Sequence, residues 1–432
     1  MTINETKLRE RISFKPFKEQ EEILACNERE VTISCGRRFG KSAICGYLAL
    51  KTLLQPNKKI WIVAPTYDLT NKVFEYVVRF LIKVAPEAQG AISYRPYPRI
   101  KFLTSTLEGR SAENSTGLLG EEVDLLIVDE ASRIPRHIYD TYLYPVTSTR
   151  QGRIILISTP FGKNWFYEHW IEAKSRGAAF NFSSKQSPYF PKEEWEYAKT
   201  RLPEMVFRQE YEAVFLEDAA TVFRGVHEIV GDTLRDAIPE RHYLMGVDLA
   251  RVNDFTVLTI VDSKTHDVVY WERLKDLDYN LQKVRIKAAA DRYNKARLIV
   301  DSTGLGDPIS EDLRQAGYVV DDIKISKKTK SQLIEKLMLF IERKAVRIPQ
   351  NEVLIDELTS YAYHVPESNQ LKAETVRYGA LSGKHDDCVI SLALAVWGLF
   401  RADPQPDKNA RMAKILNTKG SPQKKVHTFE YQ

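Results

Sequence analysis

The residues best suited to chemistry in the N-terminal half form a glycine-bearing loop between an apolar strand and a helical pattern. Val31 to Ile33 predicts a buried strand, the loop spans residues 35–42, and the helical pattern continues to Leu54. Backbone N–H groups of such a loop, with the positive end of the following helix, can hold the phosphates of a nucleotide. We therefore expect a P-loop that binds ATP. The residues expected to form it are Gly36, Arg38, Gly40, Lys41 and Ser42.

Two of these residues have specific expected roles. Lys41 reaches the phosphates, and the Ser42 hydroxyl ligates Mg²⁺. The loop departs from the usual pattern because Cys35 stands where a glycine is common. The alternative interpretation is a basic turn between a strand and a helix that binds no ligand.

A pair of carboxylates follows a second apolar strand. Residues 123–128 run almost entirely apolar into Asp129 and Glu130, as a buried strand does when its C-terminal end faces a site. Ligands of open α/β sheets bind at that edge. We expect Asp129 to hold Mg²⁺ through water and Glu130 to polarise the attacking water. The alternative is a strand that ends in a polar turn.

Two further positions of this half suit a nucleotide site. The apolar strand 153–157 ends in Ser158 and Thr159, which can sense the γ-phosphate and transmit its loss. Gln20, ahead of the P-loop strand, has an amide that can bond both edges of adenine. The alternatives are a simple strand end for the first pair and a surface helix residue for Gln20.

In the C-terminal half, two apolar strands and a late apolar helix each carry carboxylates at one end. A ribonuclease-H-like nuclease gathers its metal ligands in this order of elements. Hard oxygen ligands suit Mg²⁺ or Mn²⁺, and two such ions can activate water and stabilise the leaving oxygen of a phosphodiester. Each acid taken alone could instead be a strand end or a helix cap. The acids are Asp248, Asp254, Asp301, Asp386 and Asp387.

The elements that must position these residues predict two α/β domains. The N-terminal half alternates strands and helices, which indicates a parallel sheet with helices on both faces. A charged, aromatic-rich helical extension covers residues 188–218. The C-terminal half has an antiparallel meander followed by a parallel strand. The expected parts are a P-loop (RecA/ASCE-like) ATPase domain at 1–218, a linker at 219–240, a ribonuclease-H-like nuclease domain at 241–403 and a basic, flexible tail at 404–432.

Composition limits the class of protein. The chain of 432 residues is too long for one ordinary core, and 43% hydrophobic with 28% charged residues describes a soluble globular protein. Its four cysteines show no CxxC pair, which favours a reducing compartment. We find no apolar run of the roughly 18 residues that a membrane span needs and no apolar signal core. We expect a cytoplasmic protein without a membrane partner.

Basic residues indicate where DNA could run. The formal charge of +5 permits a nucleic-acid partner without requiring one. Lys324, Lys327, Lys328 and Lys330 follow a predicted strand as a basic loop, and residues 408–425 hold six Lys or Arg and no acid. Either group could neutralise phosphates, and either could be a solvated face.

The chain resembles the large terminase subunit of tailed bacteriophages, the motor that packages viral DNA. Six motifs occur in the family's order and cover the chain from about Gln20 to Phe400. They are GRRFGKS at 36–42, LLIVDEAS at 125–132, ISTP at 157–160, GVDLARVND at 246–254, VDSTGLGD at 300–307 and HDD at 385–387.

The resemblance implies a motor that couples ATP hydrolysis to movement of double-stranded DNA into a procapsid and that cuts concatemeric DNA. It implies that Arg37 reaches the γ-phosphate, and that Glu130, Asp248, Asp301 and Asp387 are catalytic. Asp387 is our first choice over Asp386 as metal ligand. The implied partners are portal protein, the small terminase subunit and further copies in a ring, expected to be a pentamer, with a monomer possible in solution. The implied location is the cytoplasm of the infected bacterial host.

One departure from the family pattern concerns activation between subunits. Relatives can carry Leu-Arg-Gly before the strand of the carboxylate pair, whereas this chain has Leu118-Leu119-Gly120. An arginine that acts across an interface must then come from elsewhere, for example Arg110 or Arg133. Two other functions stay open at this point: a cellular helicase-nuclease or DNA-repair ATPase, and a nucleotide-gated scaffold whose acids are structural.

Overall fold

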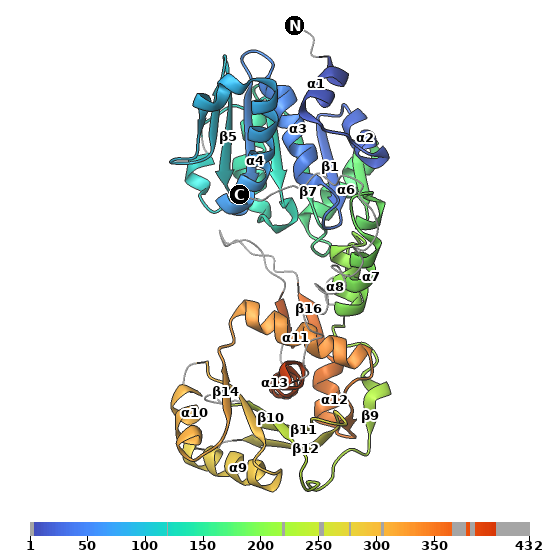
Figure 1. Ribbon diagram of the computed structural model, residues 1–432, viewed down its shortest axis with the longest axis vertical. Coiled ribbons are helices and arrows are strands. Elements are labelled where there is room, and N and C mark those ends of the chain that lie inside the picture. The colour runs from blue at the N-terminus through green and yellow to red at the C-terminus, as the bar shows by residue number, and fades with distance from the viewer. Residues whose placement is uncertain are drawn as a thin grey trace, which may run out of the picture. The chain divides into compact units, whose positions relative to one another are not determined.

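The computed structural model forms two compact units (Figure 1). It describes residues 4–118, 120–217, 221–249, 255–275, 278–303, 306–364, 377–380 and 385–402. The first unit holds Met1–Ile229, Ile325–Ala345 and Asn351–Asp386, and the second holds Val230–Lys324, Val346–Gln350 and Asp387–Gln432. Some segments of the C-terminal half therefore pack within the first unit. The domain limits expected at residues 218 and 240 stay a prediction.

The first unit is built on an eight-stranded sheet in the order β3-β4-β5-β2-β6-β7-β1-β8. From β5 to β8 in this order all neighbours pair in parallel, whereas β3 and β4 add an antiparallel edge. The strands are β1 Glu30–Cys35, β2 Lys59–Ala64, β3 Ile92–Ser93, β4 Arg99–Phe102, β5 Ser105–Ser111, β6 Leu125–Asp129, β7 Arg153–Ser158 and β8 Ala179–Phe182. The predicted parallel sheet is confirmed, and the antiparallel pairing at its edge is an addition that the sequence pattern did not indicate.

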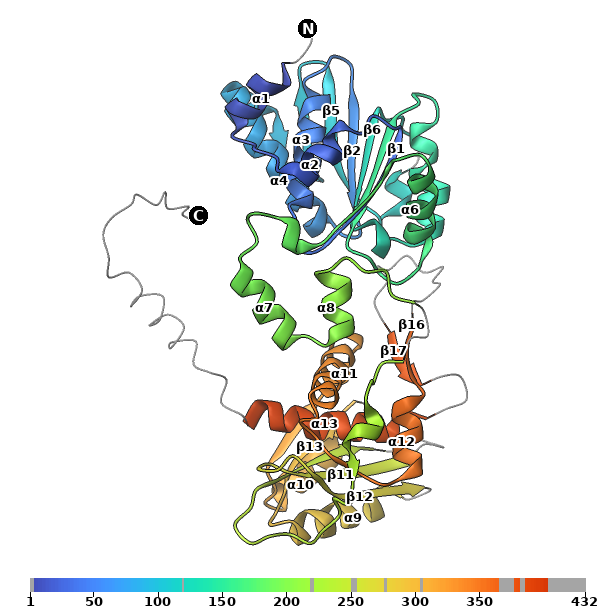
Figure 2. The same cartoon turned by 90° about the vertical axis from the view of Figure 1, so that its right-hand side faces the viewer.

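Helices cover both faces of this sheet (Figures 1 and 2). On one face lie α1 Glu5–Ile12, α2 Lys18–Ala25, α3 Lys41–Leu53 and α4 Tyr67–Val84, and on the other lie α5 Arg136–Ile138 and α6 Trp165–Ser175. Along β2, β6 and β7, apolar side chains alternate between the two resulting cores. Burial on both faces explains why β6 is apolar at every position before its final aspartate.

Helix α4 shows how the local sequence fixes an element. Thr66 caps its N-terminus by accepting a hydrogen bond from the Leu69 N–H at 3.4 Å. Val73, Phe74, Val77 and further apolar residues at helical spacing lie buried against the sheet. The helix thereby covers the face next to α3 and leaves its polar face to solvent.

The first unit contains further helices and a pair of strands beyond the large sheet. The elements are α7 Lys192–Arg201, α8 Glu204–Glu210, α11 Lys327–Glu342, α12 Glu352–Thr359 and the hairpin of β16 Tyr361–His364 with β17 Arg377–Ala380. The Glu204 N–H donates to the Glu342 carboxylate at 3.0 Å, and the Tyr363 hydroxyl donates to Gln209 Oε1 at 2.9 Å. Helix α8 is thus held by segments that come from the C-terminal half of the sequence.

The second unit contains a five-stranded sheet in the order β12-β11-β10-β13-β14. Strands β10, β11 and β12 form an antiparallel meander, and β13 and β14 continue the sheet in parallel with β10. The elements are β9 Val230–Gly231, β10 Tyr243–Asp248, β11 Phe255–Asp262, β12 Val268–Lys275, α9 Tyr279–Arg292, β13 Arg297–Asp301, α10 Gly306–Gln315, β14 Val320–Ile323, β15 Ile348–Pro349 and α13 Asp387–Ala402. This is the predicted order of meander, helix, parallel strand and helix.

Helix α13 crosses β10 at very short range. A Cβ atom on Gly246 would lie 2.0 Å from the Ser391 carbonyl oxygen and 2.6 Å from the Ala395 nitrogen. The Ser391 hydroxyl contacts the Gly246 carbonyl at 3.0 Å and the Thr259 hydroxyl at 2.9 Å. The apolar helix is therefore seated on the centre of the sheet.

Two expectations concern the helices. The first turns of α11, which Ser326 caps, contain Lys327, Lys328 and Lys330. The expectation that these lysines form a loop is therefore wrong. In the described part of the chain, none of the helices combines the length and apolar character that crossing a bilayer requires.

Candidate active sites

Three neighbouring parallel strands bring the nucleotide-site candidates to one edge of the first sheet. Strand β7 lies between β6 and β1. Strand β1 leads into the loop at residues 36–40, β6 ends at Asp129 and β7 ends at Ser158. Their C-terminal ends meet because the strands are parallel.

The loop after β1 is fixed through its backbone. The Gly36 N–H donates to the Phe182 carbonyl at 2.9 Å, and the Arg37 N–H donates to the Glu210 carbonyl at 2.8 Å. A Cβ on Gly36 would lie 2.5 Å from both Ser184 Oγ and the Tyr211 carbonyl oxygen. Only glycine fits this close approach.

Lys41 lies across the mouth of the loop. Its Nζ donates to the Cys35 carbonyl at 3.1 Å and to the Gly36 carbonyl at 3.2 Å. Lys41 and Ser42 open α3 directly after Gly40, whose φ of +100° favours glycine. Cys35 takes part through its carbonyl while its thiol points into the core, where burial raises the pKa of the thiol to about 12. This explains how a cysteine serves at a position where glycine is usual.

Gln20 braces the same loop. Its side chain is 4% exposed, and its Nε2 donates to the Phe39 carbonyl at 3.3 Å. That nitrogen would also lie 2.6 Å from a Cβ on Gly40, so Gln20 and Gly40 are closely packed. The structure therefore gives Gln20 a positioning contact to the loop, and the expected adenine contact stays a prediction.

The carboxylate pair joins a chain of hydroxyl groups. Ser158 Oγ donates to Glu130 Oε2 at 3.2 Å and lies 2.7 Å from Ser132 Oγ. Ser132 Oγ in turn donates to the Thr159 carbonyl at 2.8 Å. The end of β7 is thereby connected to Glu130 through hydrogen bonds between side chains.

Asp129 has the chemistry of a cation ligand. Burial raises the pKa of Asp129 to about 7, the Glu130 carboxylate adds to the rise, and the Lys41 ammonium opposes it. A divalent cation would favour the ionised carboxylate at such a buried position. The Asp129 carboxylate and the Ser42 hydroxyl are hard oxygen donors, so the residues fit Mg²⁺.

Two arginines meet at one glutamate beside the loop. Glu210, which is 8% exposed, accepts from Arg37 Nε at 2.6 Å and from Arg133 Nη2 at 3.2 Å. The hydrogen bond to Glu210 raises the pKa of the Arg37 guanidinium. Arg37 is thus engaged by Glu210, and its expected contact with the γ-phosphate stays a prediction.

The two arginines suggested as intersubunit residues differ in position. Arg133 lies beside the phosphate loop of its own chain, because it pairs with Glu210. Arg110 is packed between the Trp61 and Tyr97 rings and pairs with Glu108. With a side chain 13% exposed, Arg110 is poorly placed to reach another subunit. Leu119 lies outside the described residues.

In the second unit, adjacent strands bring two predicted acids together. Val247 of β10 pairs with Val300 of β13, so Asp248 and Asp301, one residue further on, end neighbouring parallel strands. Asp301 Oδ1 accepts from the Thr303 N–H at 2.9 Å and from its hydroxyl at 2.5 Å. Asp387 opens α13, the helix seated on β10. Asp254 lies outside the described residues.

The acids fit a hard cation in donor type. They offer only carboxylate oxygens, which suit Mg²⁺ or Mn²⁺. Across the described ranges, however, no three His, Cys, Asp or Glu side chains come close enough to hold an ion. Asp386 is engaged elsewhere, since its carboxylate accepts from Lys330 Nζ at 2.8 Å. The described residues therefore do not show a complete set of nuclease metal ligands.

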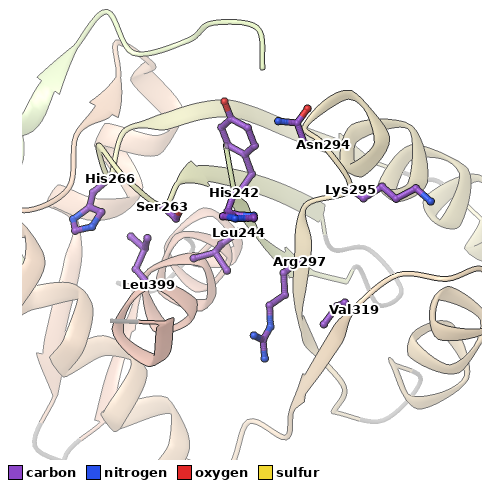
Figure 3. Close-up of a pocket in the computed structure, with 10 residues that line it drawn as sticks. His242, Leu244, Ser263, His266, Asn294, Lys295, Arg297, Val319 and Leu399 are labelled. Atoms are coloured by element: carbon purple, nitrogen blue, oxygen red, sulfur yellow. The ribbon is translucent and has the colours of Figure 1, made fainter. Parts of the chain in front are cut away.

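A cavity of about 600 Å³ lies at the other end of the second sheet (Figure 3). It is near the N-terminal ends of β10 and β13, whereas Asp248 and Asp301 are at their C-terminal ends. None of the predicted site residues lines it. Its polar lining includes His242, His266 and Lys295.

Sequence reasoning missed three residues that shape the ATP site. Ser132 is the last residue of the motif at 125–132, but no role was expected for it. Its position two residues after a catalytic carboxylate could have indicated a hydrogen-bonding role. Ser184 and Glu210 reach the loop only through tertiary structure, from positions far along the chain. No local pattern marked them.

The fold and the sites define a class: a P-loop ATPase joined to a ribonuclease-H-like nuclease. A family model described as "Terminase large subunit, T4likevirus-type, N-terminal" matches residues 32–228, and one described as "Terminase RNaseH-like domain" matches residues 245–397. The large terminase subunit of Thermus virus P23-45 is 30% identical over 435 residues, which covers 89% of this chain and 88% of that protein. The chain belongs to the large terminase subunit family.

Other relatives agree. The large terminase subunit of Escherichia phage T5 is 28% identical over 296 residues, covering 63% of this chain and 66% of that one. A solved large terminase from a thermophilic bacteriophage shares the fold with a TM-score of 0.59 and 13% identity, covering 89% of this chain and 100% of that one. The predicted fold class is confirmed, and so is the function of a phage DNA-packaging enzyme with ATPase and nuclease activity. The cellular helicase-nuclease alternative is not favoured.

Proposed function

We propose that the first unit hydrolyses ATP at the edge where β1, β6 and β7 end. The observation that carries the assignment is the position of Lys41 Nζ over the Cys35 and Gly36 carbonyls, with Asp129 and Glu130 at the end of the strand two places along. Lys41 and the loop N–H groups bind the phosphates. Ser42 and Asp129 hold Mg²⁺, which when bound offsets the charge of the phosphates.

The remaining residues of this site act on the attacking water and on the γ-phosphate. Glu130 orients the water and takes up its proton. Ser158 holds the Glu130 carboxylate, and Ser132 links Ser158 to Thr159. A displacement of Thr159 would therefore move the Glu130 carboxylate through these hydrogen bonds. Arg37 reaches the γ-phosphate once its guanidinium leaves Glu210. Arg38, exposed on the loop, and Gly40, at the start of α3, complete the phosphate site.

We propose that the second unit cuts DNA at the end of β10 and β13. Asp248, Asp301 and Asp387 are the ligands, with Asp254 as a further candidate. The pairing of Asp386 with Lys330 supports Asp387 as the ligand of that pair. Mg²⁺ or Mn²⁺, expected as two ions, would supply an activated water and stabilise the leaving oxygen. Thr303 fixes the Asp301 carboxylate for this role.

The partners follow from the packaging function. We propose that the chain moves double-stranded DNA through a homo-oligomeric ring, expected to be a pentamer, bound to the portal protein of a procapsid and assisted by the small terminase subunit. The chain would work in the cytoplasm of the infected host. The exposed Lys327 and Lys328 on α11 are candidates for contacts to DNA phosphates.

A paired experiment tests both sites on the full chain. Lys41→Ala should abolish ATP hydrolysis and leave Mn²⁺-dependent cutting of supercoiled plasmid, because the two sites are chemically separate. Asp301→Ala should do the reverse. Lys192→Ala and Asp232→Ala, both exposed residues of the same types, serve as controls.

Two results would contradict the assignments. Hydrolysis at the wild-type rate by Lys41→Ala would show that the loop is not the ATP site. Undiminished cutting by Asp301→Ala would show that the metal ligands lie elsewhere. A chelator control distinguishes metal-dependent cutting from a contaminating activity.

A further inference from the structure

Tyr189 is a large, solvent-exposed aromatic side chain close to the phosphate loop. It lies between β8 and α7, and it is 71% exposed. Its hydroxyl donates to the Lys15 carbonyl at 3.4 Å, and its ring meets the edge of Phe17 with centroids 6.4 Å apart. Lys15 and Phe17 lie directly ahead of α2, the helix that carries Gln20. Tyr189 therefore joins the N-terminal segment to the segment that follows the last strand of the sheet.

An aromatic row connects this position to the loop. The Phe17 ring meets Phe39 edge-on at 5.1 Å, and Phe39 stacks on Phe182 at 5.5 Å. Phe39 is a fully buried residue of the phosphate loop itself. The exposed ring of Tyr189 is the outer end of a row that leads through Phe17 to Phe39 in the phosphate loop.

The segment that carries Tyr189 is held in place. Ser183 and Gln186 form a capping box. Ser184 Oγ donates to the Arg37 carbonyl at 2.6 Å, and the Phe190 ring packs on Tyr211 at 5.9 Å. The backbone that carries Tyr189 is therefore fixed, and the ring itself is positioned by its contacts to Lys15 and Phe17. Ordering this segment adds little to the entropic cost of binding a stacking partner.

The Gln20 amide is partly engaged by the loop. Its amide is buried, and its nitrogen already donates to the Phe39 carbonyl. We propose that the base of the bound nucleotide stacks on Tyr189, with Phe17 at its edge, as the base subsite of the ATP site. The inference rests on the phosphate-loop function proposed above and adds the residues that hold the nucleobase.

Stacking makes a distinctive prediction about ligands. Every base has a π face, so the contact contributes to ATP and GTP alike and gives nothing to inorganic tripolyphosphate. Tyr189→Ala should weaken ATP and GTP binding to the full chain by about 5- to 100-fold, as measured by calorimetry with Mg²⁺. Its affinity for tripolyphosphate should equal that of the wild type. Tyr189→Phe keeps the ring and should bind ATP like the wild type.

Tyr197→Ala is the matched control, because Tyr197 is a 43% exposed tyrosine on α7. It should change neither affinity. Unchanged ATP affinity in Tyr189→Ala would overturn the proposal. An equal loss of tripolyphosphate affinity would also overturn it, since the change would then act through the loop. If wild-type protein bound neither ATP nor tripolyphosphate, the phosphate-loop function itself would be wrong. That outcome differs from one in which the wild type binds ATP and Tyr189→Ala binds it equally well, which would overturn only the base subsite.

Discussion

Ser132 shows how the ATP site depends on a side chain that has no expected contact with the nucleotide. Its hydroxyl lies between Ser158 Oγ and the Thr159 carbonyl, and Ser158 holds the Glu130 carboxylate. Ser132 is therefore a positioning residue for Glu130. Its loss frees the carboxylate to rotate while the phosphate loop stays in place.

Ser132→Ala should lower kcat for ATP hydrolysis by about 10- to 100-fold, because small displacements of a catalytic group cost that much. The KM for ATP should change little, since Lys41 and the loop are untouched. Steady-state kinetics give both constants. Ser175→Ala, at an exposed serine of α6, is the control. A variant with wild-type kcat, or one in which only KM rises, would contradict the positioning role.

Asp262 illustrates a residue whose charge is stabilising without catalysis. Its fully buried carboxylate, at the C-terminal end of β11, accepts from Arg241 at 2.6 Å and from Arg235 at 3.2 Å. Burial alone raises the pKa of Asp262, but the bonds from the Lys264 N–H and from both arginines lower it below its ordinary value. A lowered pKa means that the folded state favours the ionised form.

The sign of the pH dependence follows from that lowered pKa. The stabilisation is present above the unfolded pKa, near 3.8, and is lost as pH falls through the folded value. Asp262→Asn should lower the free energy of unfolding by about 3 kcal/mol at pH 7, since one partner of a buried ion pair is removed. The difference from wild type should shrink as pH is lowered below the unfolded pKa. Urea unfolding across this range measures it, and a difference that grew toward acid pH would contradict the account.

At the scale of elements, the contact between β10 and α13 fixes the acids of the second unit relative to one another. Asp248 ends β10 and Asp387 begins α13, and Gly246 lets the helix backbone lie directly on the strand. The neighbours that a new Cβ would strike are the Ser391 carbonyl oxygen and the Ala395 nitrogen. Backbone atoms cannot rotate away as the end of a side chain can.

Gly246→Ala should therefore displace α13 and cost about 3 kcal/mol or more of stability. Metal-dependent cutting should fall with it, because Asp387 moves away from Asp248. Gly379→Ala, in a strand where a Cβ would meet nothing within 4 Å, is the matched control. Thermal unfolding and a plasmid-cutting assay measure the two effects. Wild-type stability of Gly246→Ala would rule out the close crossing.

Elements with strong local patterns were predictable from the sequence. The strands ending at Asp129, Ser158, Asp248 and Asp301 each combine an apolar run with a polar end, and each lies where it was expected. Strand β3 was harder to predict, because an edge strand of two residues carries little apolar pattern. Residues 327–330 were expected to form a loop because their lysines contribute no apolar helical pattern, although Ser326 caps a helix there.

Contacts between distant residues were not predictable. Glu210 reaches Arg37 across 173 positions of sequence, and Ser184 reaches it across 147. Nothing in the residues near Glu210 indicates which strand end it will meet, since tertiary packing decides that. The motifs thus identified the groups that carry the chemistry, whereas the groups that hold them in place required the structure.

At the scale of the whole molecule, the proposed ring makes each subunit's ATP site depend on its neighbours. In a closed ring built from head-to-tail contacts, each copy both contributes to one interface and receives from the next. One copy that cannot hydrolyse ATP would then stall a motor whose other copies are intact. Packaging activity should fall faster than the fraction of wild-type chains in a mixture.

Mixing wild-type protein with Lys41→Ala tests this dependence. The amount of DNA protected inside procapsids should drop more steeply than linear dilution as the share of Lys41→Ala rises, whereas ATP hydrolysis by wild-type chains off the procapsid should fall only in proportion. The same mixtures with Lys192→Ala should package at the full rate, because that exposed lysine has no expected role. A linear fall in packaging with Lys41→Ala would mean that the subunits act independently, and the ring would then not couple their ATP sites.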